Sequence, residues 1–259
     1  MGTASPLGSR APDQLGHIDT LLNAAYGAPE DELGNKPDPL DEAIYIILSF
    51  QTDLARLKTT WSRLHTAYPS WDAVERAPVR DVARVLREGG LHKQKARTIR
   101  RLLDNIRKLA GGLSLEFLRE MHDAEAERLL THLPGLSWKG ARCVLLYSLG
   151  RDVFPVDGNT FRILKRTGVL SPRAVYRRRT LHDAIQAAVP AARRRVLHVN
   201  LVVHGQRRCL PRKPQCSSCP LSAACPRIGV QAGTGRRLQS SRAIQAEVRT
   251  TIAGRNARR

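Results

Sequence analysis

One lysine and one aspartate near the middle of the chain occupy positions suited to catalysis. Lys139 follows the Pro-Gly turn of LPGLSWK and opens an expected helix. There the positive end of the helix dipole, and an apolar wall such as neighbouring Trp138, disfavour the ammonium form and favour a nucleophilic amine. Asp157, in FPVDGNTFRI, precedes a helix expected to begin around Thr160 or slightly earlier. The alternative interpretation is a surface lysine and a helix-capping aspartate.

Four of the five cysteines lie in one short stretch, CLPRKPQCSSCPLSAAC, with the spacing Cys-x6-Cys-x2-Cys-x5-Cys. In a reducing compartment such a group is more typical of metal or cluster ligation than of disulfides. Four thiolates can hold either Zn²⁺ or [4Fe–4S], although zinc sites more often pair two Cys-x2-Cys units. The candidate ligands are Cys209, Cys216, Cys219 and Cys225. Cys143, in ARCVLLYSLG, is expected to pack as a small hydrophobe.

The elements that must position the lysine form a hairpin. AEAERLLTHLPGLSWKGARCVLLYSLG reads as two amphipathic helices joined by a tight turn. If the turn points its backbone N–H groups outward, it forms an anion site suited to a DNA phosphate. An ordinary helical hairpin inside a bundle would have the same pattern.

The remaining apolar spacing is also helical almost throughout, and no strand pattern or internal repeat competes with it. We therefore expect an all-α protein of about nine or ten helices. Residues 1–14, rich in Gly, Pro and Ser, are expected to be disordered. The Arg-rich tail, residues 229–259, is either an electrostatic arm or a solvated end.

The charge of the 259-residue chain points to a polyanionic partner. Lys and Arg number 43 against 23 Asp and Glu, which gives a formal net charge of +20. Such an excess favours nucleic acid, although a ribosomal or membrane-surface protein can be as basic. No stretch approaches the roughly 20 apolar residues of a membrane span, and the N-terminus lacks the regions of a signal peptide. We expect a cytoplasmic protein with no membrane partner.

The hairpin and the cysteines together resemble a known family. LPGLSWKGARCVLLYSLGRDVFPVDGNTFRI is similar to the helix-hairpin-helix plus Gly/Pro-Asp signature of endonuclease III-type DNA glycosylases. The cysteine spacing, LHVNLVVHG and RKPQC resemble that family's iron–sulfur region. ILSFQTD, with Gln51, and EGGLHKQKA, with Leu91, resemble its base-gap and wedge loops. The likeness covers roughly residues 30–228 and leaves the termini outside.

The resemblance implies a helix-hairpin-helix-GPD fold with two lobes. Residues 33–151 would form a six-helix barrel, and residues 15–32 and 152–228 would form a helical lobe with a structural [4Fe–4S] cluster. DNA would cross the cleft between the lobes, and the protein would be cytoplasmic and associated with the nucleoid. The first gap of the cysteine loop would present Arg212 and Lys213 to the phosphate backbone.

The resemblance also implies a base-excision-repair activity with associated abasic-site lyase chemistry. A monomer would bind double-stranded DNA with damaged bases or abasic sites and remove oxidised or otherwise damaged pyrimidines through a Lys139 Schiff base assisted by Asp157. Gln51 would fill the gap and Leu91 would wedge the opposite strand. Further DNA contacts are expected from the wedge loop and the hairpin, at His92, Leu136, Ser137, Trp138 and Gly140.

Two departures from the family pattern make substrate preference an open question. Ser137 replaces the second hairpin glycine, where it needs a negative φ or strain, and Gly158-Asn159 replaces a Thr-His pair. One alternative is a glycosylase for mismatched or methylated pyrimidines. An adenine-mismatch enzyme fits less well, because only about 34 residues follow Cys225. A catalytically weakened DNA-binding iron–sulfur protein, or a redox-responsive sensor, is the alternative from another class.

Overall fold

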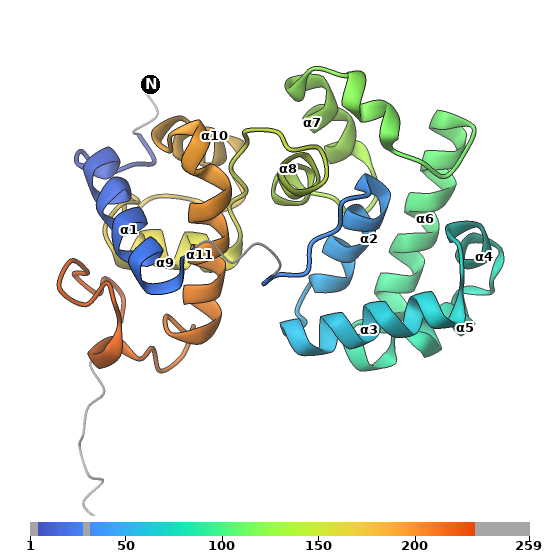
Figure 1. The fold of residues 1–259 in the computed structure, drawn as a ribbon, viewed down its shortest axis with the longest axis horizontal. Coiled ribbons are helices and arrows are strands. Elements are labelled where there is room, and N and C mark those ends of the chain that lie inside the picture. Colours follow the sequence, from blue (N-terminus) through green and yellow to red (C-terminus); the bar gives the residue numbers. More distant parts are fainter. Residues whose placement is uncertain (1–4, 28–31, 231–259) are drawn as a thin grey trace, which may run out of the picture. The chain divides into compact units, whose positions relative to one another are not determined.

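The computed structural model describes residues 5–27 and 32–230, and within these residues it is helical. The only β-type pairing in that part of the chain is a single bridge between Leu7 and Leu170. The expected all-α class is confirmed (Figure 1). Nearly all of the predicted basic tail, 229–259, lies outside the described residues.

The described residues form eleven α-helices, slightly more than the nine or ten expected. The helices are α1 (Ala11–Tyr26), α2 (Pro39–Ser49), α3 (Leu54–Ala67), α4 (Trp71–Arg76), α5 (Val79–Val85), α6 (His92–Ala110), α7 (Asp123–His132), α8 (Trp138–Tyr147), α9 (Gly158–Arg166), α10 (Arg179–Ala188) and α11 (Arg194–Arg207). Four 3₁₀ turns accompany them, at Arg87–Gly89, Glu116–Glu120, Ala191–Arg193 and Cys216–Ser218.

Short polar side chains fix several helix starts. Asp38, Asp53 and Ser70 accept hydrogen bonds from backbone amides in the first turns of α2, α3 and α4. These bonds satisfy donors that a helix leaves unpaired at its N-terminus. At the other end of α6, Gly111 adopts the left-handed conformation that closes a helix. The boundaries therefore follow local sequence chemistry.

The helices contribute to two hydrophobic cores. The first runs from Leu40 to Val153 and adds Val199 and Val203 of α11; helix α2 packs against α8, and α7 also packs on α8. The second is built by α1, α9, α10 and α11 around residues such as Phe154 and Ile163. Helix α11 contributes to both cores, and Tyr26 of α1 also packs against both, so these two helices join the two sets. The predicted domain boundaries remain a prediction.

The expectation that residues 1–14 lack structure is wrong for the described part of that segment. Helix α1 begins at Ala11, which is fully buried, and proline lies in its first turn, where a missing N–H costs nothing. Gly8 N donates to Val169 O at 2.9 Å. Apolar spacing in the segment was too short to signal this docking against the second core.

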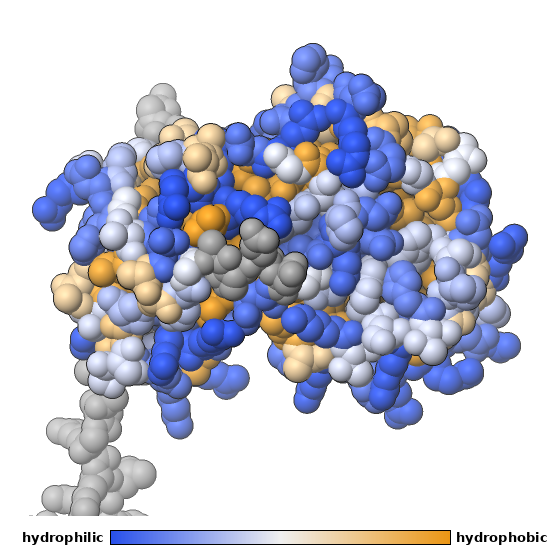
Figure 2. Space-filling view, in the orientation of Figure 1, coloured by the Kyte–Doolittle hydropathy of each residue, from blue (hydrophilic) through white to orange (hydrophobic). Residues whose placement is uncertain are grey.

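The face in view in Figure 2 is mainly hydrophilic, with hydrophobic residues in separate patches. Across residues 5–27 and 32–230 no helix combines the length and apolarity that a bilayer crossing requires. The formal net charge of +20 is compatible with a polyanionic partner.

Candidate active site

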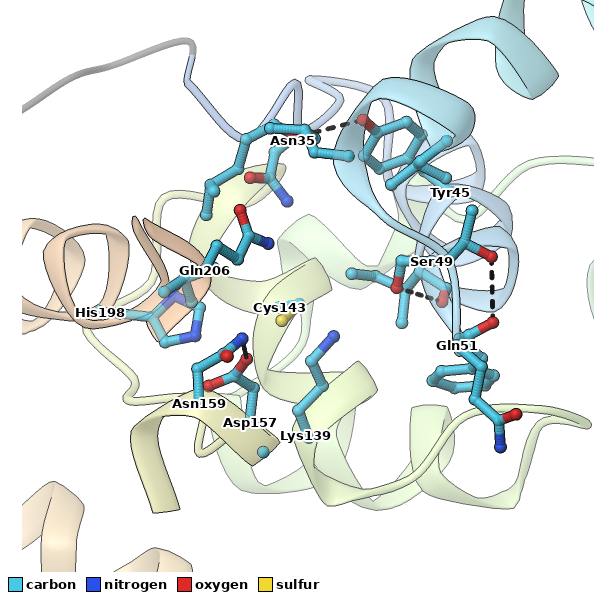
Figure 3. Close-up of a pocket in the computed structure, with 18 of the residues that line it drawn as sticks. Asn35, Tyr45, Ser49, Gln51, Lys139, Cys143, Asp157, Asn159, His198 and Gln206 are labelled. Atoms are coloured by element: carbon cyan, nitrogen blue, oxygen red, sulfur yellow. Dashed lines mark hydrogen bonds between the residues drawn. The ribbon is translucent and has the colours of Figure 1, made fainter. Parts of the chain in front are cut away.

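Lys139 and Asp157 lie in one pocket of about 290 Å³. In Figure 3 their side chains point toward the same space, Lys139 from α8 and Asp157 from the start of α9. The pocket is lined by residues from α2, the α2–α3 loop, α8, α9 and α11, among them Asn35, Tyr45, Ser49, Gln51, Ser137, Cys143, Tyr147, Asn159, His198 and Gln206. The structure thus brings together two residues that are 18 positions apart in the sequence.

The hairpin before Lys139 has the geometry that its sequence predicts. Gly135 has a φ of 87°, and a Cβ there would lie 2.4 Å from Thr98 Cγ2, so glycine is required. Ser137 is extended, with φ −116°, and therefore replaces a glycine without strain. Its side chain does not cap α8, which leaves the amides of the first helical turn available to an anion.

Asp157 is both the N-cap of α9 and a pocket residue. Its Oδ1 accepts from Thr160 N at 2.7 Å, and its Oδ2 accepts from Asn159 Nδ2 at 2.7 Å. Burial alone would raise the pKa of Asp157, but His198, the Thr160 amide and the Lys139 ammonium lower it, and the net shift is downward. The side chain is therefore a carboxylate at neutral pH.

A histidine that the sequence analysis did not single out lies beside this carboxylate. His198 is 2% exposed and lines the pocket from α11. Its Nδ1 lies 2.5 Å from Tyr147 Oη, and its Nε2 has no hydrogen-bond partner among the residues that the structure describes. Burial lowers the pKa of His198, and the neighbouring Asp157 carboxylate opposes that shift because it favours the charged ring. The surrounding apolar run gave no sign that this histidine faces a site.

Two more buried groups surround Lys139. Cys143 is 1% exposed in the first core, as expected, but its thiol also lies beside the Lys139 side chain, and burial raises its pKa to about 12. Glu42 of α2 accepts from Asn35 Nδ2 at 2.6 Å and from Lys36 N at 2.7 Å. Burial raises the pKa of Glu42 to about 7. The sequence signal for Glu42 is an acidic residue within an apolar helix, because buried acidic side chains are rare.

The Asp157 carboxylate is linked to the cysteine segment, residues 209–225, through two side chains of α9. Asn159, which donates to Asp157, accepts from Arg162 NH2 at 2.8 Å. Arg162 also donates to Cys209 O at 2.8 Å and Gly205 O at 2.9 Å. A Cβ on Gly205 would lie 2.5 Å from Asn159 Cβ, so glycine permits this close approach. Asn159, which differs from the family pattern, thus fits closely against Gly205.

The four cysteines of this segment are half-buried and unpaired by disulfides. Two of them receive polar contacts: Arg166 NH1 donates to Cys209 Sγ at 3.2 Å, and His204 Nε2 lies 3.5 Å from Cys219 Sγ. Negative sulfur ligands are stabilised by such donors, so the surroundings fit thiolate ligation.

The spacing of these cysteines bears on which group they could hold. No three His, Cys, Asp or Glu side chains of residues 5–27 and 32–230 are placed to hold a single metal ion. Zinc–sulfur bonds of about 2.3 Å would draw four sulfurs tightly together. In a [4Fe–4S] cluster each iron binds a different cysteine, which permits wider separation of the sulfurs. The polar contacts at Cys209 and Cys219 are compatible with either group.

Three predicted DNA-contacting residues share an uncommon backbone. Gln51, Leu91 and Lys213 have φ values of 52°, 48° and 53°, and they are three of the four non-glycine residues with positive φ in the described chain. Such conformations persist at functional positions when neighbouring structure holds them. Gln51 lines the pocket, although its amide points away from Lys139 in Figure 3.

The other predicted contacts differ in accessibility. Leu91 is 43% exposed and lies outside the pocket, with half-buried His92 beside it. Leu136 and Gly140 are buried, so the structure gives no support for direct DNA contacts from either residue. Trp138 is half-buried and does not line the pocket; its ring centroid lies 4.7 Å from Arg179 Cζ. Arg212 and Lys213, on the cysteine segment, are exposed and also lie outside the pocket lining.

Sequence comparisons agree on one family. The model of the HhH-GPD superfamily of base excision DNA repair proteins matches residues 44–186, which include Gln51, Leu91, Lys139 and Asp157. An Arabidopsis thaliana protein named as a candidate DNA glycosylase is 30% identical over 191 residues, covering 74% of this chain and 62% of its own length. The chain thus spans less than two thirds of that relative.

Two further relatives differ greatly in length. DNA glycosylase/AP lyase ROS1 of Arabidopsis thaliana is 28% identical over 170 residues, or 60% of this chain and 12% of ROS1. Endonuclease III of Escherichia coli K12 is 29% identical over 212 residues, or 80% of this chain and 92% of the enzyme. A trapped endonuclease III–DNA covalent intermediate superposes with a TM-score of 0.72 at 22% identity, covering 83% of this chain and 96% of that one.

Proposed function

Because this chain belongs to the HhH-GPD superfamily of base excision DNA repair proteins, we propose that it is a DNA glycosylase with associated abasic-site lyase activity. The observation that carries the proposal is the shared pocket of Lys139 and Asp157. An amine and an ionised carboxylate facing one cavity are the groups that covalent base excision needs. Endonuclease III and ROS1 are relatives whose names fit this chemistry.

Base removal begins with the lysine. The damaged nucleotide is rotated out of the duplex into the pocket, because its C1′ atom is inaccessible inside the stack. Lys139 first loses a proton to solvent, and its amine then attacks C1′. The bond from C1′ to the base breaks, and the base leaves with the proton that the attacking nitrogen gives up. The opened sugar is then joined to Lys139 Nζ as a Schiff base. Loss of the C2′ proton expels the 3′ oxygen and breaks the strand on the 3′ side.

Asp157 assists this sequence through its charge. Its lowered pKa makes it a weak proton acceptor at neutral pH, because a carboxylate stabilised in ionised form has little tendency to take a proton. Stabilising the cationic sugar as the base departs is therefore its better-supported role. The bonds from Thr160 N and Asn159 Nδ2 hold the carboxylate in place for this purpose.

The DNA partner is bound by the positively charged surface, the hairpin amides and the two strained residues. Gln51 would occupy the gap left by the base, and Leu91, which is exposed, would enter the opposite strand. The substrate is double-stranded DNA with a damaged pyrimidine or an abasic site, bound by a monomer.

We further propose that Cys209, Cys216, Cys219 and Cys225 hold a [4Fe–4S] cluster. The cluster would supply structural cross-linking of the segment, and no step of base excision requires its electrons. The contacts of Arg166 and His204 with two of the sulfurs support this assignment. Elemental analysis of the purified protein should find iron and no zinc, and its spectrum should show visible absorption. Stoichiometric zinc would contradict the assignment.

Borohydride trapping tests the catalytic proposal. Incubation with duplex DNA containing an abasic site and borohydride should give a covalent adduct, because hydride reduces the Schiff base to a stable amine. Lys139→Gln should abolish the adduct. Lys108→Gln is the matched control, since Lys108 is an exposed lysine in the last turn of α6. Absence of an adduct with the natural sequence would rule out the lyase activity.

An excision panel addresses the substrate. Duplexes containing thymine glycol, dihydrouracil, uracil, 5-methylcytosine, a mismatched thymine, or adenine opposite an oxidised guanine are incubated with the protein under single-turnover conditions. We expect the oxidised pyrimidines to be excised fastest. Preferential excision of 5-methylcytosine or mismatched thymine would instead assign the protein to the alternative substrate class.

A further inference from the structure

A lysine that the proposed chemistry does not use is buried in the first core. Lys95, in the first turn of α6, is only 3% exposed. Its Nζ donates three short hydrogen bonds: to Leu48 O at 2.7 Å, to Thr52 Oγ1 at 2.6 Å and to Gly89 O at 2.7 Å. An ammonium group has three N–H donors, so all of them are used.

The three acceptors belong to separate segments. Leu48 is in the last turn of α2, and Thr52 follows it in the gap segment, residues 50–52. Gly89 opens the wedge segment, residues 89–91. The two segments also touch directly, because Thr52 Oγ1 donates to Gly89 O at 2.6 Å. Lys95 therefore contacts both segments at the point where they meet.

Each segment carries one residue in a strained conformation. Gln51 and Leu91 both have positive φ, and neither is glycine or asparagine. Gly90, between Gly89 and Leu91, has a φ of 67°, and a Cβ there would lie 4.0 Å from Gln51 O. Strained residues persist only where surrounding contacts over-determine them. The Lys95 bonds are such contacts, since they fix the residue next to Gln51 and the start of the wedge segment.

The side chains that the two segments present are also exposed. Phe50 is 37% exposed and Leu91 43% exposed, which makes them two of the few large hydrophobic residues on the described surface. Apolar side chains that are held outward are suited to insertion between bases. We propose that Lys95 is a positioning residue that joins the gap and wedge segments into one rigid unit, so that Gln51 and Leu91 enter the duplex together. The proposal rests on the proposed function.

The chemistry of the burial supports a dedicated role. Burial lowers the pKa of Lys95 to about 8, and its three hydrogen-bond partners are two carbonyls and a hydroxyl rather than carboxylates. Holding an ammonium group there without a counter-ion requires all three acceptors. Conversely, an apolar replacement would leave the Leu48 carbonyl without its buried lysine donor, and the Gly89 carbonyl would keep only the Thr52 hydroxyl. The lysine and the segments therefore depend on each other.

The test separates entry into the duplex from chemistry on the sugar. The first assay uses duplex DNA with 2-aminopurine opposite a tetrahydrofuran abasic analogue. The fluorescence of 2-aminopurine reports its unstacking when the protein fills the gap, and this assay needs no catalysis. Borohydride trapping on single-stranded abasic DNA reports Lys139 chemistry without a gap to fill. The variants are Lys95→Met and Thr52→Val. Thr66→Val is the matched control, because the exposed Thr66 hydroxyl donates only to Ser62 O.

We expect Lys95→Met to lower the affinity for this duplex, measured by the fluorescence titration, by about 10- to 100-fold, because a charged hydrogen-bond donor is lost. Trapping on single-stranded DNA should change by less than about threefold. Thr52→Val should show the same selectivity more weakly, and it decides the matter if Lys95→Met fails to fold. Equal losses in both assays, or no loss in either, would overturn the proposal. Failure of the natural sequence to trap would count only against the proposed function, because the fluorescence assay is independent of it.

Discussion

The two ends of α9 support different parts of the molecule by different means. At the N-terminus Asp157 caps the helix, and it is held by a backbone amide and by Asn159, which lies two residues on. Toward the C-terminus Arg166 reaches the cysteine segment, where it donates to Leu210 O at 2.8 Å and Pro211 O at 2.9 Å. The first arrangement is local to the helix, whereas the second joins residues more than 40 positions apart.

This difference indicates that the cysteine segment depends on α9 for its order. The Asp157 carboxylate takes both of its hydrogen bonds from the start of α9, and short bonds with few rotatable groups hold a carboxylate firmly. The cysteine segment has one 3₁₀ turn and no longer helix in the described residues, so long arginine side chains and the proposed cluster must supply its order. Arg162 is the residue that contacts both ends, through Asn159 and Cys209.

The largest effect is expected from Asp157→Asn. Asparagine caps helices as well as aspartate, so α9 and the melting temperature should be preserved. The lost charge should slow single-turnover base excision by about 10²- to 10⁴-fold. Asp38→Asn, which makes the same change at the N-cap of α2, is the control and should excise at the normal rate. If Asp157→Asn does so too, Asp157 is merely a cap.

An intermediate effect is expected from Arg162→Met. The variant removes the donors to Asn159 Oδ1 and Cys209 O, and it should slow excision about tenfold and speed iron release to a chelator. Arg166→Met, which contacts only the cysteine segment and its surroundings, should release iron faster without slowing excision. Single-turnover rates and iron-release rates measure the two effects. Equal excision by both variants would show that the two ends of α9 are not coupled.

The smallest effect is expected from the double variant Arg212→Ala, Lys213→Ala. Both side chains are exposed, so their loss should remove about two phosphate contacts and lower the slope of log affinity against log salt by about two. The excision rate at saturating protein should not change. Lys108→Ala, at the C-terminal end of α6, is the control for general loss of charge. An unchanged salt slope would place this part of the cysteine segment away from DNA.

Much of the fold and part of the site could be predicted because their signals are contiguous. Apolar residues at helical spacing indicated the all-α class, and LPGLSWK and the cysteine spacing each lie within a short stretch. Lys139 and Asp157 were also identified, although each alone resembled an ordinary surface or capping residue. The order of residues 5–14 was missed, because docking against a distant core leaves no local pattern.

The sequence by itself determined the helices, the hairpin turn and the set of four thiols, since each depends on residues within one or two turns of each other. Only the tertiary structure decided that Glu42, His198 and Cys143 surround the lysine and that Lys95 joins two loops. The reason is physical: hydrogen bonds and electrostatic fields act over a few ångströms of space, and folding brings together groups whose separation along the chain carries no trace of that proximity.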